Sequence, residues 1–138
     1  MLKHTLTLQI FELELAICRL PPTSPIPDWI GDIDFVSVTR TPDELSIVCY
    51  EAQVPGEVKA ERNWRMLGIK GPLDFSMTGV LASLVSPLSD AGIAVFAIST
   101  YDTDYLLVKA DRFDRALEIL ELTYIIENRK EKWTGHQL

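Results

Sequence analysis

One short polar stretch, Ser99–Tyr105, is better equipped for chemistry than any other part of this chain. It carries two carboxylates, two phenols and three hydroxyls, and it separates two apolar runs, Ile93–Ile98 and Leu106–Val108. A hairpin turn between two strands needs only a short run of Gly, Asn or Asp. Because the stretch has more hydrogen-bonding groups than a turn requires, we expect it to face a polar ligand.

Catalysis is one chemistry that this stretch could perform. A carboxylate pair beside hydroxyl groups can act in general acid–base catalysis. The sequence shows no nucleophile elbow, no His beside a carboxylate, and no metal or nucleotide motif. Cys18 and Cys49 each lie in an apolar run, so we expect two buried free thiols. We therefore predict no enzyme, no metal and no cofactor. A small hydrolase that uses the acidic corner is the less favoured alternative.

Composition and net charge indicate which classes of partner this chain can bind. The 138 residues are 47% hydrophobic and 24% charged, with a net charge of −7, which fits a globular protein with a core. An acidic surface is repelled by nucleic acid phosphates and by anionic membranes. The chain has no apolar run long enough to span a bilayer and no signal-peptide pattern at its start. We expect a cytoplasmic protein that binds neither nucleic acid nor membrane.

The polar stretch has a counterpart earlier in the chain. Phe35–Val48 aligns with Val95–Val108 without a gap, so that Thr39 meets Ser99 and Glu44 meets Asp104. Each window reads as an apolar strand, a polar acidic corner and a second apolar strand. Internal similarity of this kind indicates a repeated structural unit.

The sequence pattern of the second half predicts the strands and helices on either side of Ser99–Tyr105. Arg65–Lys70 reads as a strand, and Gly92 ends the helix that follows. A second helix begins after the corner, with Asp111 as its predicted N-cap. The apolar faces of the two helices follow three- and four-residue spacing: Met77, Val80, Leu81, Leu84, Val85 and Leu88 in the first, and Phe113, Ala116, Leu117 and Leu120 in the second. The order is β-α-β-β-α with one more strand expected, which is the ferredoxin-like plan.

The first half repeats this plan with degenerate helices. Its predicted strands are Leu13–Arg19, Phe35–Thr39 and Leu45–Tyr50, with Thr5–Ile10 as a further strand. The prolines of Pro21–Pro27 forbid a regular helix, which leaves a short turn near Asp28–Ile30 and a weak second helix over Val58–Trp64.

We therefore predict an α+β fold of two fused ferredoxin-like (βαββαβ) domains, with antiparallel sheets and helices on one face. The N-terminal domain covers 1–62 and the C-terminal domain 63–138. An exchange of terminal strands between the halves is left open. The polar tail, Glu127–Gln137, is expected to be mobile or a weakly held edge.

These motifs resemble a known family. Gly71-Pro-Leu-Asp-Phe-Ser-Met-Thr-Gly79 and Ile98–Val108 are similar to small bacterial proteins made of two ACT-like domains. Arg19-Leu-Pro-Pro22 and Arg40–Ser46 are similar to their first half. The same domain type occurs in the CASTOR-type arginine sensors. The resemblance implies ACT folds, binding of an amino acid or another small ligand at domain interfaces, and frequent dimers, so we expect a homodimer.

The resemblance also implies where a ligand lies. In ACT domains the ligand usually contacts the loop before the first helix and the backbone of the adjoining strand. A helix N-terminus suits an anion such as an α-carboxylate, although Ser76 or Thr78 could equally be a plain N-cap. The predicted ligand-binding residues are Asp74, Phe75, Ser76, Met77, Thr78, Gly79, Ile98, Ser99, Thr100, Tyr101 and Asp104.

Structural alternatives stay open for the corner residues. Asp104 could accept a ligand's ammonium group or simply begin a strand, while Asp102 fits an Asx-turn better. Arg40, in the first corner, fits a surface salt bridge better than a carboxylate clamp. Because the first half lacks a proper first helix, we expect at most one helix-terminus site per chain.

We read the whole as a non-catalytic protein that binds a small molecule, an amino acid or a related metabolite, and acts as a sensor or regulatory subunit. The alternative is an ACT module for protein interaction or structure that binds no ligand, whose edge strands pair with another subunit.

Overall fold

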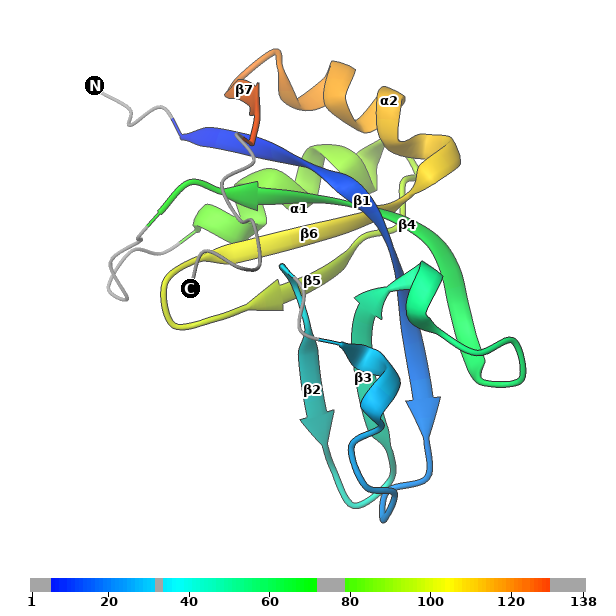
Figure 1. The fold of residues 1–138 in the computed structure, drawn as a ribbon. Helices are drawn as coiled ribbons and strands as arrows, with labels where there is room; N and C mark the ends of the chain where they lie inside the picture. The colour runs from blue at the N-terminus through cyan, green and yellow to red at the C-terminus, as the bar shows by residue number, and fades with distance from the viewer. Residues whose placement is uncertain (1–5, 32–33, 72–78, 130–138) are drawn as a thin grey trace, which may run out of the picture. The chain divides into compact units, whose positions relative to one another are not determined.

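The computed structural model describes residues 6–31, 34–71 and 79–129, and these fall into two compact units. The described part of unit 1 comprises 6–12, 65–71 and 79–129, and that of unit 2 comprises 13–31 and 34–64. Two long strands, β1 (Thr7–Leu20) and β4 (Lys59–Ile69), each belong to both units (Figure 1).

Unit 1 is a sheet with two helices. After β4 come α1 (Val80–Asp90), β5 (Phe96–Ser99), β6 (Asp104–Lys109), α2 (Ala110–Leu120) and β7 (Ile125–Asn128). The strand order is β5-β6-β4-β1, and β7 pairs in parallel with the outer side of β1. Counted from β4, this is the ferredoxin-like order 2-3-1-4, with the N-terminal half of β1 in the fourth place. The predicted α+β fold is confirmed.

The core of unit 1 lies between one face of this sheet and both helices. Leu84 and Leu88 of α1 are fully buried, as the helical spacing predicts. From the strands, Leu67 and Ile69 of β4 point to the same side, because side chains alternate along a strand. The buried members of the cluster are Leu8, Leu67, Ile69, Leu84, Leu88, Ile93, Leu106, Val108, Phe113, Ala116 and Leu120. Both helices therefore cover one face, as predicted.

Unit 2 keeps the strand order but has lost the helices. Its strands follow the order β2-β3-β1-β4, with β2 at Ser37–Arg40 and β3 at Leu45–Tyr50. Within its described residues, each helix is reduced to a three-residue 3₁₀ turn, η1 (Asp28–Ile30) and η2 (Glu51–Gln53). Its core cluster contains Ala16, Cys18, Leu45, Ile47, Cys49 and Val54, against which Trp29 and Ile30 of η1 pack. Apolar side chains on short turns thus replace the missing helical layer.

The two thiols lie together in this core. Cys18 and Cys49 are free and buried, and they stand diagonally across the β1–β3 ladder, opposite Ile47 and Ala16 respectively. A hydrogen bond between the thiols and burial both raise the pKa of Cys49, so it stays protonated. The prediction of two buried free thiols is confirmed.

Three local predictions are wrong. The predicted helix over Val58–Trp64 is absent, because Lys59–Trp64 lie in strand β4, where their side chains alternate between exposed and more buried. Thr5–Ile10 and Leu13–Arg19 are not two strands, since the described residues of both lie in β1 or directly before it. Asp111 is not the N-cap of α2, because the helix begins one residue earlier, at Ala110. Its carboxylate still lies in the first turn, where the helix dipole favours it.

The C-terminal tail is only partly described. Glu127, where the weakly held tail was predicted to begin, lies inside β7 and is paired with Gln9 of β1. Residues 130–138 lie outside the described residues. Of the two alternatives predicted for this tail, Glu127 and Asn128 follow the edge, because they lie in β7, which pairs with the outer side of β1.

Gly68 supports an aromatic pair on the sheet face of unit 1 opposite the helices. The rings of Phe11 and Tyr105 meet edge to face, with centroids 6.1 Å apart. A Cβ on Gly68 would lie 2.9 Å from Phe11 Cε1 and 3.1 Å from two Tyr105 ring carbons. The first distance is shorter than real Cβ contacts and the second is tighter than most of them, so a side chain here must displace the rings.

We therefore predict that Gly68→Ala lowers the free energy of unfolding by about 1–3 kcal/mol, the usual cost of overpacking. Urea unfolding followed by circular dichroism measures this change. Gly56→Ala is the matched control, because a Cβ there meets nothing within 4 Å. Equal effects of the two substitutions would contradict this role of Gly68.

Candidate functional site

The corner between β5 and β6 is a compact turn held by its own threonines. The backbone N–H of Thr100 donates to the carbonyl of Thr103 at 2.8 Å. Thr100 Oγ1 donates to the same carbonyl at 3.1 Å and accepts from the Thr103 N–H at 3.4 Å. The four residues 100–103 therefore close on themselves, which leaves Ser99 paired with Asp104 across the ladder.

The corner of unit 2 is built in the same way. The N–H of Thr41 donates to the carbonyl of Glu44 at 2.9 Å. Thr41 Oγ1 donates to that carbonyl at 3.4 Å and accepts from the Glu44 N–H at 3.2 Å. Arg40 and Leu45 form the last pair of the ladder. Thr41 is thus the structural counterpart of Thr100, and Glu44 that of Thr103.

This correspondence corrects the alignment of the two copies by one residue. The sequence alignment matched Glu44 with Asp104, whereas the hydrogen bonds and ladders match Leu45 with Asp104. Burial agrees, because Ile47 lies in the core of unit 2 and Leu106 in the core of unit 1. A slip of one residue moves every side chain to the other face of the strand, so the error changes which residues are equivalent.

In the corrected register, Asp104 differs from its counterpart in unit 2 in both side-chain type and burial. Its counterpart Leu45 is fully buried in the core of unit 2, while Asp104 is half-buried and accepts a hydrogen bond from Ser99 Oγ. A carboxylate at a position that another copy fills with leucine needs a polar partner. The polarity at this position therefore belongs to unit 1 alone, and the two corners do not share it.

Thr103 ties this corner to the end of β4. Its Oγ1 donates to the carbonyl of Ile69 at 2.8 Å, and the residue is only 9% exposed. Ile69 is the last residue of β4, so the bond joins the corner to the strand that leads toward the predicted binding loop. Sequence reasoning missed Thr103, and the one signal for it was a threonine at the last turn position where the other copy has glutamate.

The structure brings some of the predicted site residues together. Ser99, Thr100 and Asp104 meet at the β5–β6 corner, and Ile98 pairs with Tyr105 one step along the ladder. The side chain of Tyr101 is 81% exposed. Asp74, Phe75, Ser76, Met77 and Thr78 lie outside the described residues.

Gly79 begins the helix of the predicted site. It is the N-cap of α1, with φ 76° in the left-handed region, and the helix itself begins at Val80. A Cβ at Gly79 would meet no atom of the described residues within 4 Å. The glycine is therefore required by its backbone conformation.

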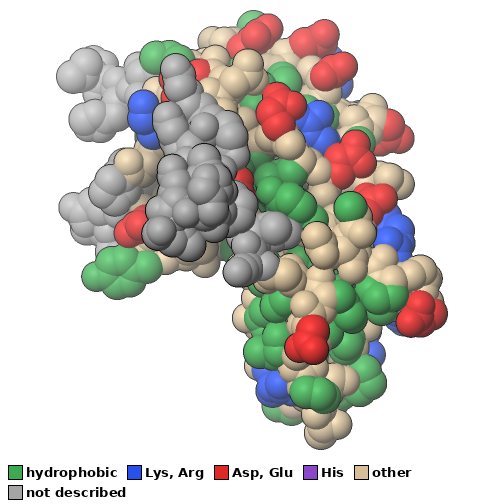
Figure 2. Space-filling model, viewed as in Figure 1, with side chains coloured by type: hydrophobic (Ala, Val, Ile, Leu, Met, Phe, Trp, Pro, Cys, Tyr) green, Lys and Arg blue, Asp and Glu red, His purple; other side chains and the backbone are tan. Residues whose placement is uncertain are grey.

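Two other classes of site receive no support from the described residues. None of their His, Cys, Asp and Glu side chains gather in groups of three or more that could hold a metal ion. None of the helices in these ranges is long and apolar enough to cross a membrane. On the face shown in Figure 2, acidic and basic side chains are interspersed and do not form a single basic patch.

Comparison with known proteins identifies the fold. A family model described as an ACT domain matches residues 59–121, and a second model, described as an N-terminal domain, matches residues 14–57. The crystal structure of protein Atu0741 from Agobacterium tumefaciens is 34% identical, with a TM-score of 0.83, and the match covers 95% of this chain and 100% of that one. The chain belongs to the ACT domain family.

Other relatives share only part of their length with this ACT protein. The human cytosolic arginine sensor for mTORC1 subunit 1 is 39% identical over 59 residues, which are 42% of this chain and 18% of the sensor. Human CASTOR3P is 34% identical over 87 residues, 54% of this chain and 53% of that protein. The chain thus spans about half of one relative and less than a fifth of the other. An aspartate kinase from Clostridium acetobutylicum shares the fold at 10% identity, with a TM-score of 0.60 over 82% of this chain and 33% of the kinase.

Thr103→Val tests the tie between the corner and β4. Valine keeps the shape but leaves the Ile69 carbonyl without its donor, so we expect the free energy of unfolding to fall by about 1–3 kcal/mol. Urea unfolding measures the change. The exposed Thr123 offers a matched Thr→Val control, expected to change stability by less than about 0.5 kcal/mol. A Thr103→Val protein as stable as the control would show that the bond contributes nothing.

Proposed function

We propose that unit 1 binds an amino acid or a related small metabolite non-covalently, and that the chain acts as a sensor or regulatory subunit. The observation that carries the proposal is the Ser99–Asp104 pair, which stands where the other copy has the buried Leu45. Family membership supports a regulatory, ligand-binding role, and one relative is by its name an arginine sensor.

The backbone around the corner supports the same role. β5 pairs with β6 and is the last strand of its path in the described sheet, so one side of Ile98–Ser99 has carbonyl and N–H groups outside the ladder. Such groups suit the ammonium and carboxylate of an amino acid, since both bind well to backbone partners. The Asp104 carboxylate adds a negative charge for the ammonium group.

At the opposite end of the ligand, the α-carboxylate would be bound at the start of α1. Gly79 and the first N–H groups of the helix supply donors and the positive end of the helix dipole. Asp74, Phe75, Ser76, Met77 and Thr78 complete the proposed loop, and Tyr101 contributes its phenol. Unit 2 has only the three-residue 3₁₀ turn η1 in place of the first helix among its described residues, so we propose one such site per chain.

Ligand binding would act by shifting a packing equilibrium. A ligand changes such an equilibrium only by its difference in affinity for the two states. We propose that the chain forms a cytoplasmic homodimer and that occupation of the site favours one packing of its subunits. Catalysis is not part of the proposal.

A thermal-shift screen of the twenty amino acids tests the proposal. A ligand at about 100 times its Kd stabilises the folded state by about 2.7 kcal/mol, which raises Tm by roughly 10 °C for a chain of this size. We expect at least one amino acid to do this, and we expect Asp104→Asn to remove most of the shift. Asp114→Asn, an exposed position on α2, is the matched control and should respond like the wild type.

Three outcomes would count against this account. A folded protein that responds to no amino acid would favour an interaction module without a ligand. A full response in Asp104→Asn would remove Asp104 from the site. Hydrolysis of an ester or phosphate panel that is abolished by Asp104→Asn would favour the enzyme.

A further inference from the structure

The segment that joins α2 to β7 contacts the first turn of α1. The hydroxyl of Tyr124 donates to Ser83, whose carbonyl oxygen and Oγ lie 3.1 Å and 2.9 Å away. Ser83 closes that first turn, because its N–H donates to the Gly79 carbonyl at 2.9 Å and its Oγ donates to the Val80 carbonyl at 2.7 Å. Tyr124 therefore holds the residues with which α1 begins.

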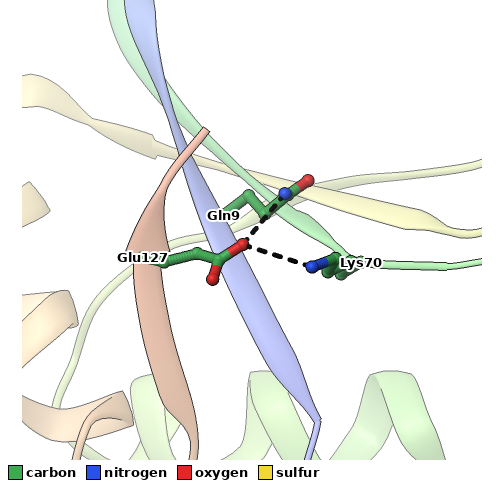
Figure 3. A network of polar contacts seen from close by, with 3 residues as sticks. All are labelled: Gln9, Lys70 and Glu127. Carbon is green, nitrogen blue, oxygen red and sulfur yellow. Dashed lines mark hydrogen bonds and ion pairs between the residues drawn. The ribbon is translucent and has the colours of Figure 1, made fainter. Parts of the chain in front are cut away.

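Three residues further on, Glu127 of β7 contacts the end of β4. Glu127 Oε2 lies 3.7 Å from Lys70 Nζ and accepts a hydrogen bond from Gln9 Nε2 at 3.2 Å (Figure 3). Lys70 follows the last residue of β4, and its N–H donates to the Thr7 carbonyl at 2.9 Å. Glu127 thus bridges β1 and the point where the chain leaves β4.

Strand β7 and the residue after it are themselves fixed to the sheet. The N–H groups of Ile125 and Arg129 donate to the carbonyls of Leu6 and Ile10, at 3.2 Å and 3.0 Å. The Arg129 guanidinium also lies 4.9 Å from the centre of the Phe11 ring, a favourable cation–π distance. The Lys70–Glu127 pair is partly exposed and weak by itself, but the ladder sets its geometry in advance, so less side-chain entropy is lost in forming it.

We propose that Tyr124 and Glu127 are positioning residues, which hold the start of α1 and the end of β4 in place and make β7 responsive to the ligand. These two points are the described flanks of the proposed binding loop, and residues 72–78 form no part of the inference. The inference rests on the proposed function for its ligand. Linkage is reciprocal, so a ligand that orders these flanks also strengthens the attachment of β7.

Amide hydrogen exchange without any ligand tests the positioning role. Loss of one hydrogen bond changes a local equilibrium about fivefold, so we expect Tyr124→Phe to speed exchange at Ser83 by about that factor. Glu127→Gln should do the same at Lys70. The amide of Leu107, in the centre of the same sheet, reports global opening and should not change.

Matched controls remove the same groups elsewhere. Glu118→Gln breaks the surface pair with Arg115 on α2, and Tyr50→Phe removes a phenol from unit 2. Neither should alter exchange at Ser83 or Lys70. If Tyr124→Phe and Glu127→Gln leave exchange at these two amides unchanged, or raise it equally at Leu107, the two residues have no positioning role.

A second arm uses the amino acid with the largest thermal shift. We expect both variants to weaken its binding about threefold to tenfold, and we expect the ligand to slow exchange at 125–128 in the wild type. If the amino acid binds both variants with wild-type affinity and leaves β7 unaffected, the inference fails while the proposed function stands. If no amino acid binds, the proposed function and the coupling fail, and the ligand-free arm still decides the positioning role.

Discussion

Each unit of this chain has the ferredoxin-like strand order 2-3-1-4, in which the first strand of the motif needs a fourth strand hydrogen-bonded along its outer side. In unit 1 the first strand is the end of β4, and its neighbour is the start of β1. In unit 2 the first strand is the second half of β1, and its neighbour in the strand order is β4. An unpaired strand edge in a buried position leaves N–H and C=O groups without partners, which is costly. The two long strands meet this requirement in both units.

The same arrangement displaces β7 from the place that a ferredoxin-like motif reserves for it. The strand that follows α2 would normally lie beside β4, but the N-terminal half of β1 lies there, and β7 pairs with its outer side. In this outer position Tyr124 and Glu127 reach the start of α1 and the end of β4. The contacts that we propose as a means of regulation are therefore a consequence of the strand order.

The repeated corner shows how one backbone can support two different roles. Both corners close with the same threonine bonds, so their turn geometry makes no demand on the residue that follows. Unit 2 uses that residue, Leu45, for its core, where short turns replace the helices. Unit 1 has two helices to cover its core and has a carboxylate at this position, Asp104. Equivalent positions of the two copies thus hold a buried leucine in unit 2 and a half-buried carboxylate in unit 1.

Much of the fold could be predicted from the sequence, because periodicity reports burial directly. The faces of α1 and α2, the two hairpins and the lack of a helix over Pro21–Pro27 all follow from spacing and from proline chemistry. The register between the copies could not be predicted in this way. Ile47–Cys49 and Leu106–Val108 are wholly apolar and wholly buried, so alternation gives no sign of which residue faces which side. The threonine bonds of the turns, together with the strand ladders, show the correct match.

The helix predicted over Val58–Trp64 fails for a related reason. A weak pattern of charged and apolar residues fits a short helix or a strand equally well, and pairing with a distant strand decides between them. Thr103 was missed because its function is a contact with Ile69, which is 34 residues away. Contacts between residues so far apart depend on the strand order, which no local pattern contains.

The most direct test of the account is a nuclear magnetic resonance titration of the ¹⁵N-labelled protein with a mixture of amino acids. We expect shifts at the amides of Ile98–Asp104 and Gly79 that saturate with concentration, and no shifts at the equivalent corner, Arg40–Leu45. Saturating shifts at both corners alike, or at Arg40–Leu45 alone, would contradict the claim that Asp104 distinguishes a binding copy from a structural one.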